Sequence, residues 1–123
     1  MSVDLKSESG DEFGFSNAGW RAIAEMADSY GFDDSQCTEP EEGVIVVPAQ
    51  SALNFAGIIE KALAGTNDTE IAAAISRRLT ELLVQPSDSP LFPNDPVRFT
   101  EKGVSYWRDF VRFARRGGFT VYF

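Results

Sequence analysis

The chain has 123 residues, of which 43% are hydrophobic and 24% charged, so it is long enough to bury one hydrophobic core but too short for two. Its formal net charge of −8 disfavours sequence-independent binding to nucleic acid or to an anionic membrane, since both depend on a positive field. With no histidine and a single cysteine, it cannot use Ser-His or Cys-His catalysis or form a disulfide within the chain.

The first 48 residues predict a β-hairpin, a helix, an acidic loop and a buried strand. The segments SVDLKS and EFGFS alternate apolar and polar residues, and ESGDE between them has the composition of a turn. Apolar residues then recur at helical spacing, from a cap at Ser16 or Asn17 to a C-terminal stop at Gly31. Residues 33–43 are expected to form a loop, and GVIVVP indicates a short buried strand that stops at Pro48.

The remaining residues predict three helices, a loop and a final strand. An apolar stripe at helical spacing covers residues 48–64, and a second one follows the cap Asn67 and ends near Val84. Four prolines between residues 86 and 96 exclude a helix there. A last helix is expected over residues 100–116, stopped by Gly117, and the alternating tail FTVYF predicts a half-buried strand.

These elements predict a single α+β domain over residues 1–123, with about four helices packed on a small, mainly antiparallel sheet. The sheet is expected to consist of the N-terminal hairpin, the VIVV strand and the C-terminal strand. The longest uncharged stretch, residues 43–59, is too polar to span a membrane, and the first ten residues do not resemble a secretory signal. We therefore expect a cytoplasmic location and no membrane or nucleic-acid partner.

A row of arginines lies on the last predicted helix. Arg108, Arg112 and Arg115 are spaced i, i+4 and i+7 and so share one face, with Arg116 beside them. Such a row could bind carboxylates or phosphates in bidentate geometry. It could equally be a solvated helix face, or it could pair with the acidic loop at 33–42.

The opposite charge gathers in DDSQCTEPEE, which supplies the acids Asp33, Asp34, Glu39, Glu41 and Glu42. The segment lacks the glycine and the final glutamate of an EF-hand, so we predict neither a metal nor another cofactor there. The acids should also raise the pKa of the Cys37 thiol, which disfavours a nucleophilic role. A partner with a basic surface is the more natural ligand for this segment.

The proline-rich loop carries two large apolar residues, Leu91 and Phe92, between Pro90 and Pro93. They could fold down on the core as a plug or project as a preformed apolar contact for a partner. The plug is favoured, because exposed pairs of large apolar residues are uncommon on monomers.

The spacing of several residues resembles a group of small uncharacterised bacterial proteins with an N-x-x-W start and an F-x-x-F-[CA]-x-x-G-G-F end. The matching residues are Asn17, Trp20, Ala27, Tyr30, Gly31, Phe32, Val47, Ala56, Ala62, Leu63, Phe110, Phe113, Ala114, Arg116, Gly117, Gly118 and Phe119. Residues 33–46 and the proline-rich loop depart from that pattern. The resemblance implies a bacterial origin and a compact fold, and it brings no catalytic residue.

Two functional hypotheses follow from these patterns. The first is a non-catalytic protein-interaction domain, immunity-like or adaptor-like, that uses its acidic surface and the proline-rich loop against a basic partner. The second is a small-molecule-binding protein or enzyme in which the arginine row holds an anion and Tyr106 or an acid transfers a proton. In both cases Trp20 and Trp107 are assigned to the core. The oligomeric state is left open.

Overall fold

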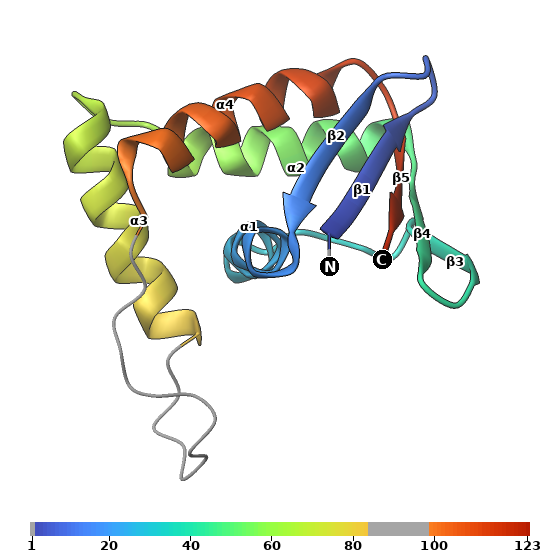
Figure 1. The fold of residues 1–123 in the computed structure, drawn as a ribbon, viewed down its shortest axis with the longest axis horizontal. Coiled ribbons are helices and arrows are strands. Elements are labelled where there is room, and N and C mark those ends of the chain that lie inside the picture. The colour runs from blue at the N-terminus through green and yellow to red at the C-terminus, as the bar shows by residue number, and fades with distance from the viewer. Residues whose placement is uncertain (1, 84–98) are drawn as a thin grey trace, which may run out of the picture.

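A computed structural model of the chain describes residues 2–83 and 99–123, which form four helices packed on a five-stranded antiparallel sheet (Figure 1). In chain order the elements are β1 (Ser2–Ser7), β2 (Glu12–Ser16), α1 (Asn17–Ser29), β3 (Thr38–Glu41), β4 (Val44–Val47), α2 (Ala49–Ala62), α3 (Asp68–Leu83), α4 (Glu101–Arg115) and β5 (Phe119–Tyr122). The predicted α+β class is confirmed. Leu91 and Phe92 lie outside the described residues.

The C-terminal strand is at the centre of the sheet, whose order is β2-β1-β5-β4-β3. Val121 of β5 is opposite Leu5 of β1 on one side and Ile45 of β4 on the other, both in antiparallel register. The predicted pairing of this strand with the hairpin and with VIVV is therefore confirmed. Because β5 has a neighbour on each side, its backbone groups are held in ladders rather than left to fray.

The prediction of a loop over residues 33–43 is wrong in part, since β3 pairs with β4 at the edge of the sheet. All four residues of β3, TEPE, are exposed. A strand without a buried side shows no apolar alternation, and proline and glutamate are poor strand formers. The backbone pairing with β4 forms this strand, and that pairing leaves no pattern in the side chains.

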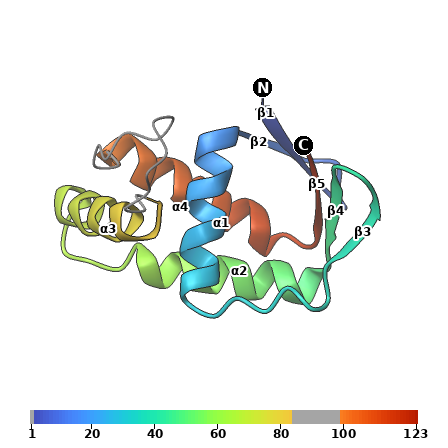
Figure 2. The same ribbon diagram turned by 90° about the horizontal axis from the view of Figure 1, so that it is seen from below.

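One face of the sheet packs against the helices. Along β1 the side chains alternate, so that Val3 and Leu5 are buried while Asp4 and Lys6 are exposed. Helices α2 and α4 lie side by side against this sheet, and α3 lies at the end away from it (Figures 1 and 2). The buried face of each element therefore meets that of another, as a two-layer domain requires.

Aromatic rings fill the centre of this core. Phe110 of α4 is completely buried, and its ring meets those of Phe15, Phe55 and Phe119 edge-on at centroid distances of 5.5, 5.3 and 5.9 Å. These four rings come from β2 near the N-terminus, from α2 in the middle of the chain, and from α4 and β5 near the C-terminus. Each fully buried ring contributes about 1.5–3 kcal/mol through burial, with a further contribution from edge-to-face geometry.

The helix ends follow the local sequence signals. The Ser16 side chain accepts a hydrogen bond from the Gly19 N–H at 3.0 Å, and Asn67 does the same for the Glu70 N–H at 2.9 Å. After α1, Gly31 has a φ of 85°, the left-handed conformation that favours glycine. The predicted caps and the stop at Gly31 are thus confirmed.

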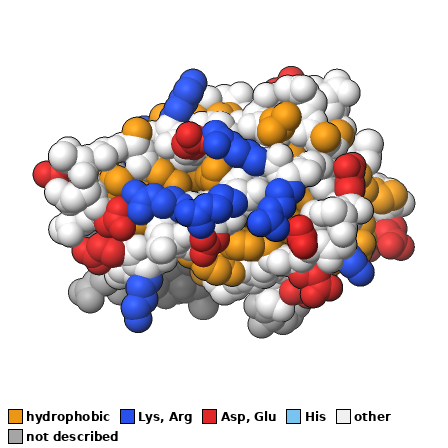
Figure 3. Space-filling view, turned by 90° about the horizontal axis from the view of Figure 1, so that it is seen from above, with side chains coloured by type: hydrophobic (Ala, Val, Ile, Leu, Met, Phe, Trp, Pro, Cys, Tyr) orange, Lys and Arg blue, Asp and Glu red, His pale blue; other side chains and the backbone are white. Residues whose placement is uncertain are grey.

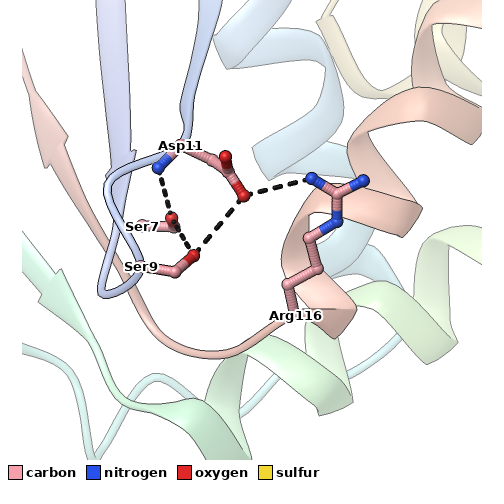
Figure 4. A network of polar contacts seen from close by, with 4 residues as sticks. All are labelled: Ser7, Ser9, Asp11 and Arg116. Atoms are coloured by element: carbon pink, nitrogen blue, oxygen red, sulfur yellow. Dashed lines mark hydrogen bonds and ion pairs between the residues drawn. The ribbon is translucent and has the colours of Figure 1, made fainter.

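A polar network joins the β1–β2 turn to the end of α4 (Figure 4). The Asp11 carboxylate accepts a hydrogen bond from the Arg116 guanidinium at 3.1 Å and another from the Ser9 hydroxyl at 3.4 Å. The Asp11 N–H in turn donates to the Ser7 hydroxyl at 2.9 Å. Because Arg116 and Asp11 are exposed, this contact orients the turn more than it stabilises the fold.

Candidate functional site

The arginine row predicted from the sequence does lie on α4, with Arg116 directly after the last residue of the helix. Figure 3 shows that Lys and Arg side chains gather, with Asp and Glu among them, on the face of the molecule seen from above. Each arginine pairs with a carboxylate of the same chain, and the pairs are Arg108 with Asp68 at 2.8 Å, Arg112 with Asp109 at 2.7 Å, Arg115 with Glu60, and Arg116 with Asp11 at 3.1 Å. None of these acids belongs to the segment at 33–42, so the predicted pairing with that segment is wrong. The acids that the arginines meet come from α2, from α3, from the β1–β2 turn and from α4 itself.

A surface hollow of about 720 Å³ lies between α2 and α4, beside Arg108, Arg112 and Arg115 and the α2 residue Lys61. It is the place where an anion would meet most of the row. An incoming phosphate would compete with Glu60 and Asp68, which already occupy two of the guanidinium groups. The geometry thus brings the predicted cations together but leaves only part of their charge for a ligand.

Tyr106, the predicted proton donor or acceptor, takes part in a contact between two elements of the fold. Its hydroxyl donates a hydrogen bond to the Gly14 carbonyl and so ties α4 to β2. Burial, and secondarily the charge of Asp109, raises the pKa of Tyr106. The phenol therefore stays protonated at neutral pH and keeps this hydrogen bond.

The acidic segment is here defined as residues 33–42, and its five acids are Asp33, Asp34, Glu39, Glu41 and Glu42. All five are exposed, and within residues 2–83 and 99–123 none of them forms an ion pair. Asp33 accepts a hydrogen bond from the Ser35 N–H at 2.9 Å, and hydrogen bonds from Ser35 lower the pKa of its carboxyl. The segment thus presents its negative charge to solvent, and no cation of the described ranges compensates it through an ion pair.

An apolar pocket of about 560 Å³ lies beside this segment, between α1 and the inner face of the sheet. We call it the Trp20 pocket. Its walls are Trp20 of α1, Phe55 of α2 and the strand residues Ile45 and Val121. In Figure 2 the loop after α1 runs along this side of the molecule to the β3–β4 hairpin, and Cys37 of that loop closes one wall.

The charged residues that line the Trp20 pocket are mainly acidic, and we call them its rim. Glu25 and Asp28 lie on α1, and Asp34 lies on the acidic segment, while Arg21 is the cation among the lining residues. The structure therefore brings Asp34, a predicted site residue, into the lining of a pocket whose other walls the sequence does not indicate. The other four acids of the segment, Asp33 and those at 39, 41 and 42, do not line the pocket.

The thiol of Cys37 is half-buried in this wall, and its pKa is raised, as the sequence predicted. Burial is the main cause, the charge of Asp34 adds to it, and a hydrogen bond with Ser51 opposes it. The predicted cause, the acidic neighbours, is therefore the smaller one. A thiol that stays protonated near neutral pH acts as part of an apolar wall rather than as a nucleophile.

The assignment of both tryptophans to the core is correct only for Trp107, which is 2% exposed. Trp20 is partly buried, with one ring face stacked on Phe55 at 6.1 Å and its edge near Phe123 at 6.4 Å. The helical spacing of Trp20 predicts that it faces inward. It cannot show that the facing strands leave room beside the indole.

Within the described ranges, no group of three or more acidic or cysteine side chains is placed to hold a metal ion, and no helix is long and apolar enough to cross a membrane. The chain matches no protein-family model, no curated protein and no solved structure at a significant level. The resemblance to the bacterial group therefore stays a prediction.

Proposed function

We propose that the protein is a non-catalytic interaction domain, immunity-like or adaptor-like, that recognises a basic protein partner through its acidic segment. The observation that carries this proposal is that the two charged surfaces differ in their ion pairs. The arginines of α4 are matched by carboxylates of the same chain, whereas the five acids of the segment have no ion-pair partner among the described residues.

An uncompensated acidic surface favours binding to a cationic one in two ways. Its field accelerates the encounter with a basic partner and slows the encounter with acidic competitors. In addition, no ion pair within the described part of the chain has to be broken before the carboxylates can meet a lysine or an arginine. The arginine row lacks this advantage, because an anion would have to compete with the carboxylates already bound.

The acids of β3 also indicate how the contact is made. An edge strand can bind a partner through its backbone, but Pro40 lacks an N–H and the neighbouring glutamates Glu39 and Glu41 repel a second acidic edge. Recognition through side-chain charge therefore fits this strand better than extension of the sheet by a partner strand.

Two variants with equal net charge test the proposal. In the first, the five segment acids are replaced by their amides, which keeps their size and the hydrogen bond that residue 33 accepts. In the second, the same change is made at five exposed acids elsewhere, namely Asp4, Glu12, Glu70, Glu81 and Glu101. Both changes reduce the formal charge from −8 to −3.

Partners recovered by the wild-type chain are identified by mass spectrometry, and their affinity is measured over a range of ionic strengths. We expect a basic partner whose Kd rises with salt, that binds the control variant nearly as well as the wild type and that binds the segment variant much more weakly. Equal loss in both variants would mean that overall charge matters and the segment does not. A partner unaffected by salt or by either variant would refute the proposal.

The alternative, an anion site on the arginine row, is testable at Arg112. The Arg112 side chain is 70% exposed, and its partner Asp109 lies on the same helix. Arg112 is therefore the arginine of the row that is most available to a ligand. Phosphorylated and carboxylated metabolites should raise the Tm of the wild type and not of Arg112→Ala if this site functions. A ligand at about 100 times its Kd would stabilise the protein by about 2.7 kcal/mol.

A further inference from the structure

We propose that the basic partner inserts one apolar side chain, flanked in its own sequence by lysine or arginine, into the Trp20 pocket. This inference rests on the proposed function and names the feature of the partner that gives specificity. It combines two surfaces that share Asp34 and Cys37, since the segment that carries the uncompensated acids also forms one wall of the pocket.

The size and walls of the pocket suit an apolar anchor. Its volume of about 560 Å³ lies within the range of about 300–1,000 Å³ that is usual for ligand sites. The indole of Trp20 is held in place by stacking on Phe55 at an interplanar angle of 18°. An inserted side chain would thus meet a rigid aromatic surface and lose little to reordering of the wall.

The rim selects the charge of whatever carries that anchor. Three carboxylates, those of Glu25, Asp28 and Asp34, line the pocket together with the single guanidinium of Arg21. None of these four groups forms an ion pair within the described parts of the chain. An anionic apolar ligand such as a fatty acid would be repelled here, whereas positive charges beside the anchor would be attracted.

The extent of the negative charge favours a protein segment over a small cationic molecule. From Asp34 the acidic segment continues through Glu39, Glu41 and Glu42 along the β3–β4 hairpin, beyond the walls of the pocket. A small cation could meet only the rim. A peptide with its anchor in the pocket could place further basic residues along the segment, and so use charges that no occupant of the pocket alone can reach.

The test uses three synthetic peptides, Lys-Lys-Phe-Lys-Lys, Lys-Lys-Ala-Lys-Lys and Glu-Glu-Phe-Glu-Glu, titrated into the full chain and followed by NMR. We expect the phenylalanine peptide with lysines to bind about tenfold or more tightly than its alanine counterpart, because a phenyl ring leaves water. Its largest shifts should fall on pocket-lining residues. The acidic peptide should not bind measurably.

A pair of variants tests whether the phenylalanine of the peptide binds in the Trp20 pocket. Ala24→Phe adds a ring from α1 into the pocket, and Ala74→Phe makes the same change at an exposed position on α3. Ala24→Phe should remove the preference for phenylalanine over alanine, while Ala74→Phe should keep it. As a second readout that needs no variant, the phenylalanine peptide should slow alkylation of Cys37, the only thiol in the chain, more than the alanine peptide does.

The outcomes separate this inference from the proposed function. If both lysine peptides bind equally, and both are lost in the segment variant, the anchor is refuted and the acidic surface stands. If the acidic peptide binds as well as the basic one, the rim does not select charge and the inference fails. If no lysine peptide binds at low ionic strength, both proposals are rejected. Concentration-dependent dimerisation that buries Cys37 would assign the pocket to a second copy of the chain and would also overturn the inference.

Discussion

Replacing Phe119 by alanine tests whether the C-terminal strand is the centre of the fold. The Phe119 side chain is 2% exposed and packs against Phe110 and Phe113 at centroid distances of 5.9 and 5.7 Å. Its backbone lies opposite Ser7 on one side and Val47 on the other. The substitution therefore opens a cavity between the sheet and α4 that neither can readily fill.

The expected cost is about 3–5 kcal/mol, the usual range for a buried phenylalanine changed to alanine. A domain of this size has a total stability of about 5–15 kcal/mol, so Phe119→Ala should lose a large part of it. Phe123→Ala is the matched control, since it makes the same chemical change four residues later at a side chain that is 54% exposed. It should cost about 1 kcal/mol or less.

The free energy of unfolding is measured by urea denaturation, followed by tryptophan fluorescence and circular dichroism. Deletion of residues 119–123 is the extreme case, because it removes the ladders to both β1 and β4, and it should abolish cooperative unfolding. Equal values for Phe119→Ala and Phe123→Ala, or an unchanged transition after the deletion, would refute the central position of β5. The Trp20 pocket would then lose its basis as well, since Val121 forms part of its wall.

Three further predictions concern turns, surface charge and the thiol. Gly118→Ala should destabilise the fold by about 1–3 kcal/mol, because a Cβ at this position would lie 2.8 Å from a backbone carbonyl oxygen of β4. Gly57→Ala should instead stabilise the fold by about 0.5–1 kcal/mol, because a Cβ at this position in α2 would meet open space. Thermal unfolding of both variants checks the contrast. Arg116→Ala should cost about 0.2–1 kcal/mol, and a cost that did not shrink in high salt would contradict the exposed ion pair with Asp11. Cys37 should be alkylated in the folded protein with a pH midpoint above that of the urea-unfolded chain, because the folded state holds the thiol proton more tightly. For the same reason the unfolding free energy should fall as the pH rises past the pKa of the thiol in the unfolded state. Cys37→Ser should remove this contribution of the thiol to the pH dependence.

The periodic spacing of apolar residues along the chain determined most of the secondary structure. Alternation in SVDLKS and FTVYF predicts strands, and the stripes after Ser16 and Asn67 predict helices, because burial of one face imposes periods of 2 and 3.6 on the sequence. This periodicity did not predict the edge strand β3. It has no buried face, so its formation depends on the backbone of β4 rather than on its own side chains.

The site is predicted less completely than the fold, for a related reason. The sequence places the segment acids together and the arginines on one face, since both depend on local spacing. It does not show that Arg115 meets Glu60 or that Arg116 meets Asp11, because those partners lie about half a chain and nearly a whole chain away. The tertiary structure therefore decides which charged surface has no ion pairs within residues 2–83 and 99–123 and can bind a partner.

By itself, then, the sequence determined the period of the elements that have a buried face, the side-chain caps at the start of α1 and α3, and the side chains that carry charge. Tertiary structure alone decided that Trp20 lies beside an open pocket, that Cys37 is part of its wall, and that the acids of residues 33–42 form no ion pair with the residues that the structure describes. The physical reason is that periodicity specifies which side of an element is buried. The volume left between two buried sides, and the pairing of distant charges, depend on how the elements pack against one another.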